Sequence, residues 1–288
     1  MSVISIEDAK GILEDRNVVS VGAHGDEERR RRHGTKTTFV RVVEVHTEAV
    51  PSALPASASA GEIRIAGKPA SVAAAIASVK QARAMAGVIP VSGFSLADLL
   101  ELSGGGLASL TDLSARLAAA GLHLVSEVPL DLLESPAEAI RASRDGGLEV
   151  PRLVVRGSDA TDEGDASSRL RLLALARDVQ DAAGGIRAFA PLARVTSIAQ
   201  PSTGYDDIRH IAVARLFVHN IDSIQVDWAL YGPKLAQVAL TMGADDVDSV
   251  SALEGDLGRR RSPLEEIRGN ITAAGLQPVE RNARFEPR

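Results

Sequence analysis

The sequence contains no cysteine among its 288 residues. Thiolate chemistry is therefore excluded, and so is any metal cluster that only cysteine sulfur could hold. The absence does not fix a cellular compartment, because cytosolic chains and disulfide-free secreted chains can both lack cysteine. It therefore constrains the chemistry of the protein more than its location.

Long apolar runs and concentrated positive charge are missing as well. No stretch of about 18 apolar residues occurs, so we expect no membrane-spanning helix. The first residues form an acidic, capped amphipathic pattern instead of a signal peptide, and we therefore expect a cytoplasmic protein. The net charge is −6, and the arginines are scattered instead of lying in a stripe with aromatic residues, which argues against a nucleic-acid partner.

Strand-like and helix-like segments alternate along the chain. Apolar runs at residues 17–21, 37–46 and 62–67 are typical of strands, whereas residues 71–87 form a helical pattern that ends at a glycine. Repeated units of this kind predict an α/β fold, a TIM-barrel-like (β/α) barrel. An open doubly wound sheet is the alternative. However, no G-x-G-x-x-G follows a strand, and the GGG at residues 104–106 follows a helix and indicates a helix stop.

One domain accounts for the whole chain in this interpretation. A helical segment at residues 1–34 precedes a barrel core at residues 35–255, and residues 256–288 form a C-terminal helix and tail. Residues 47–61, TEAVPSALPASASAG, have no periodicity and are predicted to form a loop after the first barrel strand.

The run IQVDWAL at residues 224–230 alternates apolar and polar residues and is predicted to be one strand. Its apolar residues suit the outer helices, so Gln225 and Asp227 are directed into the barrel as candidate ligand-binding residues. A buried carboxylate needs a partner or a ligand. Asp227 is therefore either paired with an interior arginine or lysine, or a ligand-binding and catalytic residue.

The next strand follows a helix that ends at Gly243, and it begins in the acidic run ADDVD. In a parallel barrel the carboxyl ends of the strands carry the chemistry. We therefore expect Asp245, at the strand start, to be structural, either capping a neighbouring element or pairing with an arginine. Asp248 and Ser249 lie further along the strand and are candidate ligand-binding residues, and Asp248 is also a catalytic candidate.

Histidines and arginines supply the remaining candidates. His46 ends the predicted first barrel strand and is a third catalytic candidate, and Arg156, at the end of PRLVVRG, is a candidate ligand-binding residue. No metal site is expected, because the histidines lack metal-ligand spacing. The arginine run at residues 29–32 is interpreted as a solvated or salt-bridged helix face. The other histidines are predicted to be solvated (His24, His33) or to lie at helix or strand ends (His123, His210, His219).

Four motifs occur together in the last third of the chain. They are T-G-x-x-D-I-R at residues 203–209, W-x-x-x-G-P-K-L-A-Q at 228–237, G-A-D-D at 243–246 and P-V-E-R at 278–281. Together they resemble the aminofutalosine synthase branch of the radical S-adenosylmethionine (SAM) enzymes of menaquinone synthesis. Related branches make cyclic dehypoxanthine futalosine and the deazaflavin chromophore. The resemblance covers residues 175–285 and implies a barrel of the radical-SAM type.

The sequence also departs from this family. Its members hold a [4Fe–4S] cluster with three cysteines in a loop after the first strand, where this chain has the cysteine-free residues 47–61. The relatives carry D-G-T where this chain has Asp248, Ser249 and Val250, which suggests a changed pocket. The resemblance therefore implies a degenerate member that keeps the barrel and lacks the cluster, and we expect no cofactor.

Three functions remain open. The first is a non-catalytic paralogue of aminofutalosine synthase that acts as a binding or partner subunit in the menaquinone pathway, with another pathway enzyme or a second copy of the chain as its partner. The second is a cluster-independent lyase or isomerase that uses Asp227, Asp248 or His46 for acid–base chemistry on a futalosine-like or chorismate-derived substrate. The third is a small-molecule sensor or carrier. A perturbed carboxylate among convergent polar groups favours the second function, and a filled apolar interior favours the first.

Overall fold

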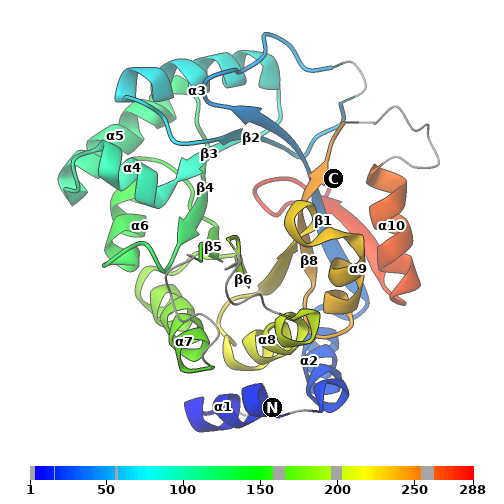
Figure 1. The fold of residues 1–288 in the computed structure, drawn as a ribbon. Coiled ribbons are helices and arrows are strands. Elements are labelled where there is room, and N and C mark those ends of the chain that lie inside the picture. Colours follow the sequence, from blue (N-terminus) through cyan, green and yellow to red (C-terminus); the bar gives the residue numbers. More distant parts are fainter. Residues whose placement is uncertain (1–3, 16, 56–57, 158–165, 196–202, 254–262) are drawn as a thin grey trace. The chain divides into compact units, whose positions relative to one another are not determined.

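The computed structural model describes residues 4–15, 17–55, 58–157, 166–195, 203–253 and 263–288. Among these residues, no helix is both long enough and apolar enough to cross a membrane. Figure 1 shows the strands and helices and labels most of them.

The strands, in chain order, are β1 (Lys36–His46), β2 (Glu62–Ala66), β3 (Val91–Ser95), β4 (Leu124–Pro129), β5 (Arg152–Val155), β6 (Ala188–Ala193), β7 (Ser223–Asp227), β8 (Asp246–Ser251) and β9 (Gln277–Arg281). The helices are α1 (Ile6–Glu14), α2 (Val18–His33), α3 (Val72–Ala86), α4 (Leu96–Leu102), α5 (Leu107–Ala120), α6 (Pro136–Asp145), α7 (Ala166–Ala183), α8 (Gly204–Phe217), α9 (Trp228–Leu240) and α10 (Pro263–Ala273).

Eight parallel strands form a β-barrel. Strands β2 to β8 follow one another in the sheet, and β1 lies next to both β8 and β2, which closes the ring. β9 lies beside β1 as an additional strand. The barrel predicted from the alternation of strands and helices is therefore confirmed, and the open doubly wound sheet is excluded.

The chain divides into two compact units. Unit 1 comprises residues 1–39, 153–248 and 267–279, and unit 2 comprises residues 40–152, 249–266 and 280–288. In unit 1, α8 packs on β6 and β7, and in unit 2, α3 packs on β2 and β3. Each unit therefore covers its strands with its own helices.

Alternation along the strands separates an apolar face from a polar face in each unit. In unit 2, Val45 of β1 lies opposite Ile65 of β2, and both are buried. In unit 1, Val226 of β7 lies opposite Val247 of β8. The residues between them point to the other side of the sheet, which is the barrel interior, and many of these are polar or charged.

Two predicted strand boundaries are wrong. Residues 17–21 begin α2, because the Asn17 side chain accepts the Ser20 N–H and caps the helix. β7 ends at Asp227, three residues before the predicted end of the strand. The Asp227 carboxylate accepts the Leu230 N–H at 3.1 Å and so starts α9, although the apolar and polar alternation continues.

The N-terminal helices are fixed to unit 1 by close packing. Ser5 and Asp8 form a capping box at the start of α1. α2 lies against α8 (Figure 1), and a Cβ atom added at Gly25 would lie 2.4 Å from the Met242 carbonyl oxygen. Glycine at this position therefore permits an approach that no larger residue allows.

The remaining boundaries follow the expected signals. Ser71 caps α3, which is followed by Gly87, and Gly104 and Gly105 follow α4 with positive φ. The described part of residues 47–61 contains no helix or strand, as predicted, and residues 56–57 lie outside the described residues.

Candidate functional site

A buried ion pair occupies the interior face of β2 in unit 2. Arg64 donates from Nε and Nη2 to the two carboxylate oxygens of Glu62, at 2.7 and 2.9 Å. The Ser92 hydroxyl donates to the same carboxylate. Burial raises the pKa of Glu62, but the charges of Arg64 and Arg152 and the hydrogen bonds outweigh it and bring this pKa down to about 2. Glu62 is therefore an anion at neutral pH, and it positions Arg64.

Ser249 contacts this pair from β8. Its Oγ accepts a hydrogen bond from Arg64 Nη1 at 3.0 Å. Ser249 has a φ of 58°, in the left-handed region that L-residues rarely adopt. Ser249, a predicted ligand-binding residue, thus binds Arg64, which was not among the predicted site residues.

His46 ends β1, as predicted, and its side chain is exposed. A Cβ atom added at Gly67 would lie 2.9 Å from His46 Cε1, so the ring rests against glycine backbone. Glu44, two residues earlier, lies opposite Arg64 and is also exposed. Solvent therefore reaches this part of the interior face.

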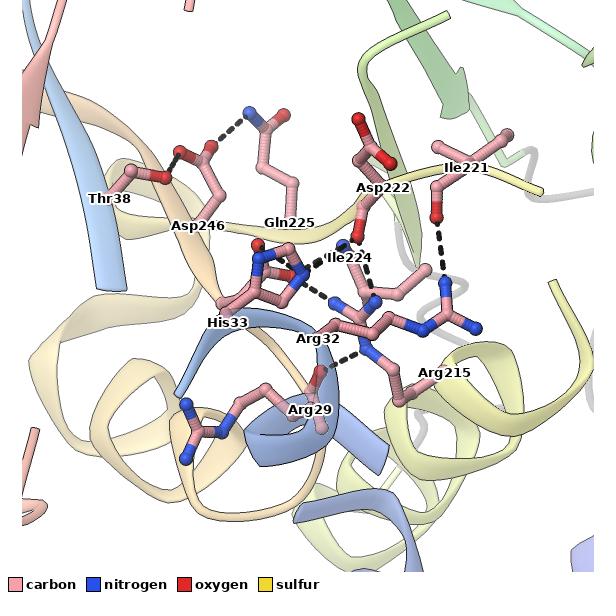
Figure 2. A network of polar contacts seen from close by, with 12 residues as sticks. Arg29, Arg32, His33, Thr38, Arg215, Ile221, Asp222, Ile224, Gln225 and Asp246 are labelled. Carbon is pink, nitrogen blue, oxygen red and sulfur yellow. Dashed lines mark hydrogen bonds and ion pairs between the residues drawn. The ribbon is translucent and has the colours of Figure 1, made fainter. Parts of the chain in front are cut away.

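The interior face of unit 1 carries a second polar cluster. Asp246 accepts hydrogen bonds from the Thr38 hydroxyl and from Gln225 Nε2 (Figure 2). The Gln225 side chain is buried, and its Oε1 has no hydrogen-bond partner among the described residues. The amide nitrogen is held by Asp246, so Oε1 faces away from it.

Asp227 lies two residues further along β7, and its contacts include α9 and an arginine. It accepts the Leu230 N–H at the start of α9, and Arg194 Nη1 lies 3.3 Å from its Oδ2. Beside them, the Tyr231 hydroxyl donates to the Ala193 carbonyl, and burial raises the pKa of this phenol. Of the two alternatives stated for Asp227, these contacts favour the ion pair.

The predicted site residues fall into separate groups. Gln225, Asp227 and Asp248 share the interior face of unit 1, with Asp248 directly opposite Asp227 in the ladder. Asp248 is buried. Arg156 follows β5 and is exposed. His46 and Ser249 belong to unit 2.

Asp245 is structural, as predicted, and it pairs with an arginine. Arg215 is fully buried and donates to Asp245 and to the carbonyls of Gly243 and Asp222, the latter two at 2.8 Å. The Ile224 N–H also donates to Asp245, at 2.9 Å. This network joins α8 to the starts of β7 and β8, at the end of the strands that carries stability.

The environments of the neighbouring histidines and arginines differ in part from those predicted. His33 is not simply solvated, because its Nε2 lies 3.0 Å from the Asp222 carbonyl oxygen. His210 lies within α8 instead of at its end, and burial lowers its pKa to about 3. The arginine run is salt-bridged to Asp26 and Glu28, as interpreted, although Arg29 is fully buried.

The charged residues of β2 were not among the predicted site residues. Glu62 and Arg64 alternate with two isoleucines, which is the same period-two signal that directed Gln225 and Asp227 inward. The signal that could have found them was therefore present, but the segment was used only to assign a strand.

A comparison with solved structures identifies the type of barrel. Methylornithine synthase, a radical SAM enzyme of known structure, superposes with a TM-score of 0.64 at 11% identity, over 96% of this chain and 94% of that one. At this identity the match establishes the barrel fold alone. The fold is that of the radical SAM enzymes.

Sequence comparisons show which radical SAM enzymes this chain resembles. Residues 187–288 match the family model described as the CofH/MqnC C-terminal region. The aminodeoxyfutalosine synthase of Streptomyces coelicolor is 31% identical over 51% of this chain and 42% of its own length. The cyclic dehypoxanthine futalosine synthase of the same organism is 31% identical over 59% of this chain and 48% of its own length. The chain is a distant relative of these enzymes and spans about half of their length.

The residues of this chain do not fit an iron–sulfur cluster. Residues 47–61 follow β1, where a radical SAM enzyme holds its cluster, and they offer one carboxylate, Glu48, and several serine hydroxyls. Cluster iron is held by thiolates, with histidine as an occasional substitute. Among the described residues, no three histidine, aspartate or glutamate side chains are grouped so that they could hold a metal. A radical SAM cluster of the usual kind is therefore absent.

Proposed function

We propose that this protein is a non-catalytic paralogue of the aminodeoxyfutalosine synthases and acts as a binding or partner subunit in menaquinone synthesis. The observation that carries the proposal is a radical-SAM barrel in a chain without cysteine. Its partner is another enzyme of the pathway or a second copy of the chain. The futalosine link rests on the two relatives named above.

The interior is polar and not the filled apolar interior expected of a partner subunit. However, its carboxylate with a shifted pKa, Glu62, is held as an anion by Arg64, so the polar groups support binding of a ligand and not proton transfer. Buried charges in each unit are positioned by hydrogen bonds, as in the Glu62–Arg64 pair and the Gln225–Asp246 contact. Such groups cost free energy when they are buried, and they are common where a protein recognises a polar ligand. The interior is therefore suited to a small polar molecule.

Anaerobic reconstitution tests the loss of radical chemistry. The protein is treated with iron and sulfide, and bound iron and cleavage of SAM to 5′-deoxyadenosine are measured. The aminodeoxyfutalosine synthase of S. coelicolor, treated in parallel, is the positive control. We expect no stoichiometric iron and no cleavage for this chain, and either one would overturn the proposal.

Deletion of the gene in its own organism tests the pathway. We expect the menaquinone content to fall, and we expect supplied dehypoxanthine futalosine to restore it if the subunit supports an earlier step. An unchanged menaquinone content would contradict a role of this protein in menaquinone synthesis. Co-purification of a tagged chain from the same cells then distinguishes a pathway enzyme from a second copy as the partner.

A cluster-independent acid–base enzyme is the second candidate. It is favoured by the pairing of Asp227 and Asp248 at directly opposite positions of β7 and β8. Because Asp227 caps α9 and pairs with Arg194, Asp248 is the better residue to test. Turnover of a futalosine-like nucleoside that is lost in Asp248→Asn, with an unchanged thermal melt, would favour this candidate over the first.

A further inference from the structure

The residues after β9 form a compact turn, which we call the tail (residues 281–288). The Asn282 N–H donates to the Glu286 carbonyl at 2.9 Å. The Asn282 side-chain oxygen accepts the N–H groups of Arg284 and Glu286, at 2.8 and 3.1 Å. These local bonds define the shape of the tail, so it can dock or detach as one piece.

The tail docks at the amino ends of the strands of unit 2. The Ala283 N–H donates to the carbonyl of Gly61, just before β2, at 3.1 Å. A Cβ atom added at Gly61 would lie 2.5 Å from the Arg281 carbonyl oxygen, so the tail backbone rests against glycine. Arg284 pairs with Glu149, just before β5, at 2.8 Å, and both side chains are partly exposed. The tail is therefore held by backbone contacts and by an ion pair that solvent screens.

His123, just before β4, lies beside this ion pair and uses a ring nitrogen as an acceptor. The Val91 N–H, at the start of β3, donates to His123 Nδ1 at 3.0 Å. The Glu149 N–H donates to the His123 carbonyl at 2.9 Å, which ties the histidine to the residue that binds the tail. A protonated imidazole has no acceptor nitrogen. Val91 is fully buried, so protonation of His123 would take this partner away from a buried N–H.

The surroundings of the ring favour its neutral form. Burial lowers the pKa of His123, and the positive charges of Arg284 in the tail and Arg83 in α3 lower it further, whereas the charge of Glu149 raises it. Departure of the tail would remove the charge of Arg284 and admit water to the ring. The protonated form is therefore more stable when the tail has left. By linkage, protonation favours departure of the tail by the same factor.

We propose that His123 and the tail form an acid-sensitive latch on unit 2, in which the neutral histidine keeps the tail docked and the protonated histidine releases it. The added proton places a positive charge near Arg284 and competes with Arg284 for Glu149. Because docking lowers the pKa of His123, the latch is closed above about pH 6.5 and opens as the pH falls below this value. Release uncovers the Gly61 carbonyl and the buried Ala283, so it changes the surface that unit 2 offers to a partner. The latch is a property of the fold and does not depend on the function proposed above.

Hydrogen exchange measured by mass spectrometry tests the latch in the intact chain, at about pH 7.5 and about pH 5.5. A synthetic peptide with the sequence of residues 277–288 gives the intrinsic exchange rate at each pH. The ratio of the peptide rate to the protein rate is the protection of the tail. We expect this protection to fall about threefold or more on acidification, because one proton allows a fall of up to about tenfold per pH unit. Helix α5, which also belongs to unit 2, is the internal reference, and its protection should stay constant.

Three variants separate the latch from a general loosening in acid. In His123→Asn, the amide oxygen can accept the Val91 N–H and takes up no proton, so the tail should stay protected at both pH values. His24→Asn is the matched control, because His24 is exposed on α2, and it should keep the pH dependence of the wild type. Arg284→Gln should lower the protection at neutral pH and reduce its dependence on pH, because it removes both the ion pair and a charge that disfavours protonation of His123.

Equal protection of the tail at the two pH values in the wild type would overturn the latch. An equal loss of protection in the wild type and in His123→Asn would overturn it as well, and so would a loss of the same size in α5. If His123→Asn does not fold, Arg284→Gln decides the question, because an unchanged pH dependence in that variant contradicts the latch.

Discussion

Replacing Asp245 with asparagine removes one charge from a buried pair and keeps the shape of the side chain. Asp245 is 3% exposed, and its partner Arg215 has no exposed surface. Breaking a buried pair on one side costs about 3–5 kcal/mol, because the other charge stays buried without compensation. The carbonyls of Gly243 and Asp222 still accept from Arg215, which places our expectation at the lower end of this range. The corresponding loss in melting temperature is roughly 6–12 °C.

The assay is a thermal melt followed by circular dichroism at neutral pH, with urea unfolding to obtain the free energy. Glu101→Gln is the matched control, because Glu101 pairs with Lys68 at 2.6 Å on the exposed surface. That pair should contribute little, since solvent screens it. The double variant Asp245→Asn with Arg215→Met should recover most of the lost stability. An Asp245→Asn melt as close to wild type as that of the control would refute the reasoning.

Three further predictions concern other buried contacts. Asp227→Asn should lower the free energy of unfolding by on the order of 1–3 kcal/mol in urea titrations, because it weakens the pair with Arg194, whereas a ligand-facing carboxylate would give no loss. Gly25→Ala should lower the melting temperature because its Cβ meets backbone, while Gly11→Ala in α1, with open space around it, should raise it. Burial lowers the pKa of His210 to about 3, so below about pH 6.5 the unfolded chain takes up a proton that the native state does not, and stability falls as the pH drops toward 3. His210→Gln should reduce the loss between pH 7 and pH 5 by about 2 kcal/mol in urea unfolding, and an equal loss in both forms would contradict this assignment.

Local signals in the sequence predicted much of the fold. β1 and β2 were found from their apolar runs, and α3 was found from its helical pattern and its final glycine. The inward direction of Gln225 was predicted from period-two alternation, and in the structure Gln225 shares a face of the sheet with Asp246 and contacts it. These features depend on neighbouring residues, so one sequence was enough to predict them.

Contacts between distant residues could not be predicted in the same way. Asp227 pairs with an arginine 33 residues earlier, and Thr38 donates to a residue 208 positions away. No spacing rule relates such partners, because the closed sheet brings them together. The errors at Asn17 and Asp227 have a different cause. There a single capping side chain turned an apolar or alternating run into a helix.

The separation between β1 and the C-terminal tail has a consequence for the order of folding. Arg41 in β1 binds Glu280 in β9 across 239 residues, and Arg288 binds the same carboxylate. The Gln277 N–H donates to the carbonyl of Thr35, just before β1. β1 lies near the start of the chain and β9 near its end. Because closing so long a loop is slow, we expect the bonds between them to form late in folding. In pulsed hydrogen exchange during refolding, we expect the amides of β3 and β4 to become protected before those of β9.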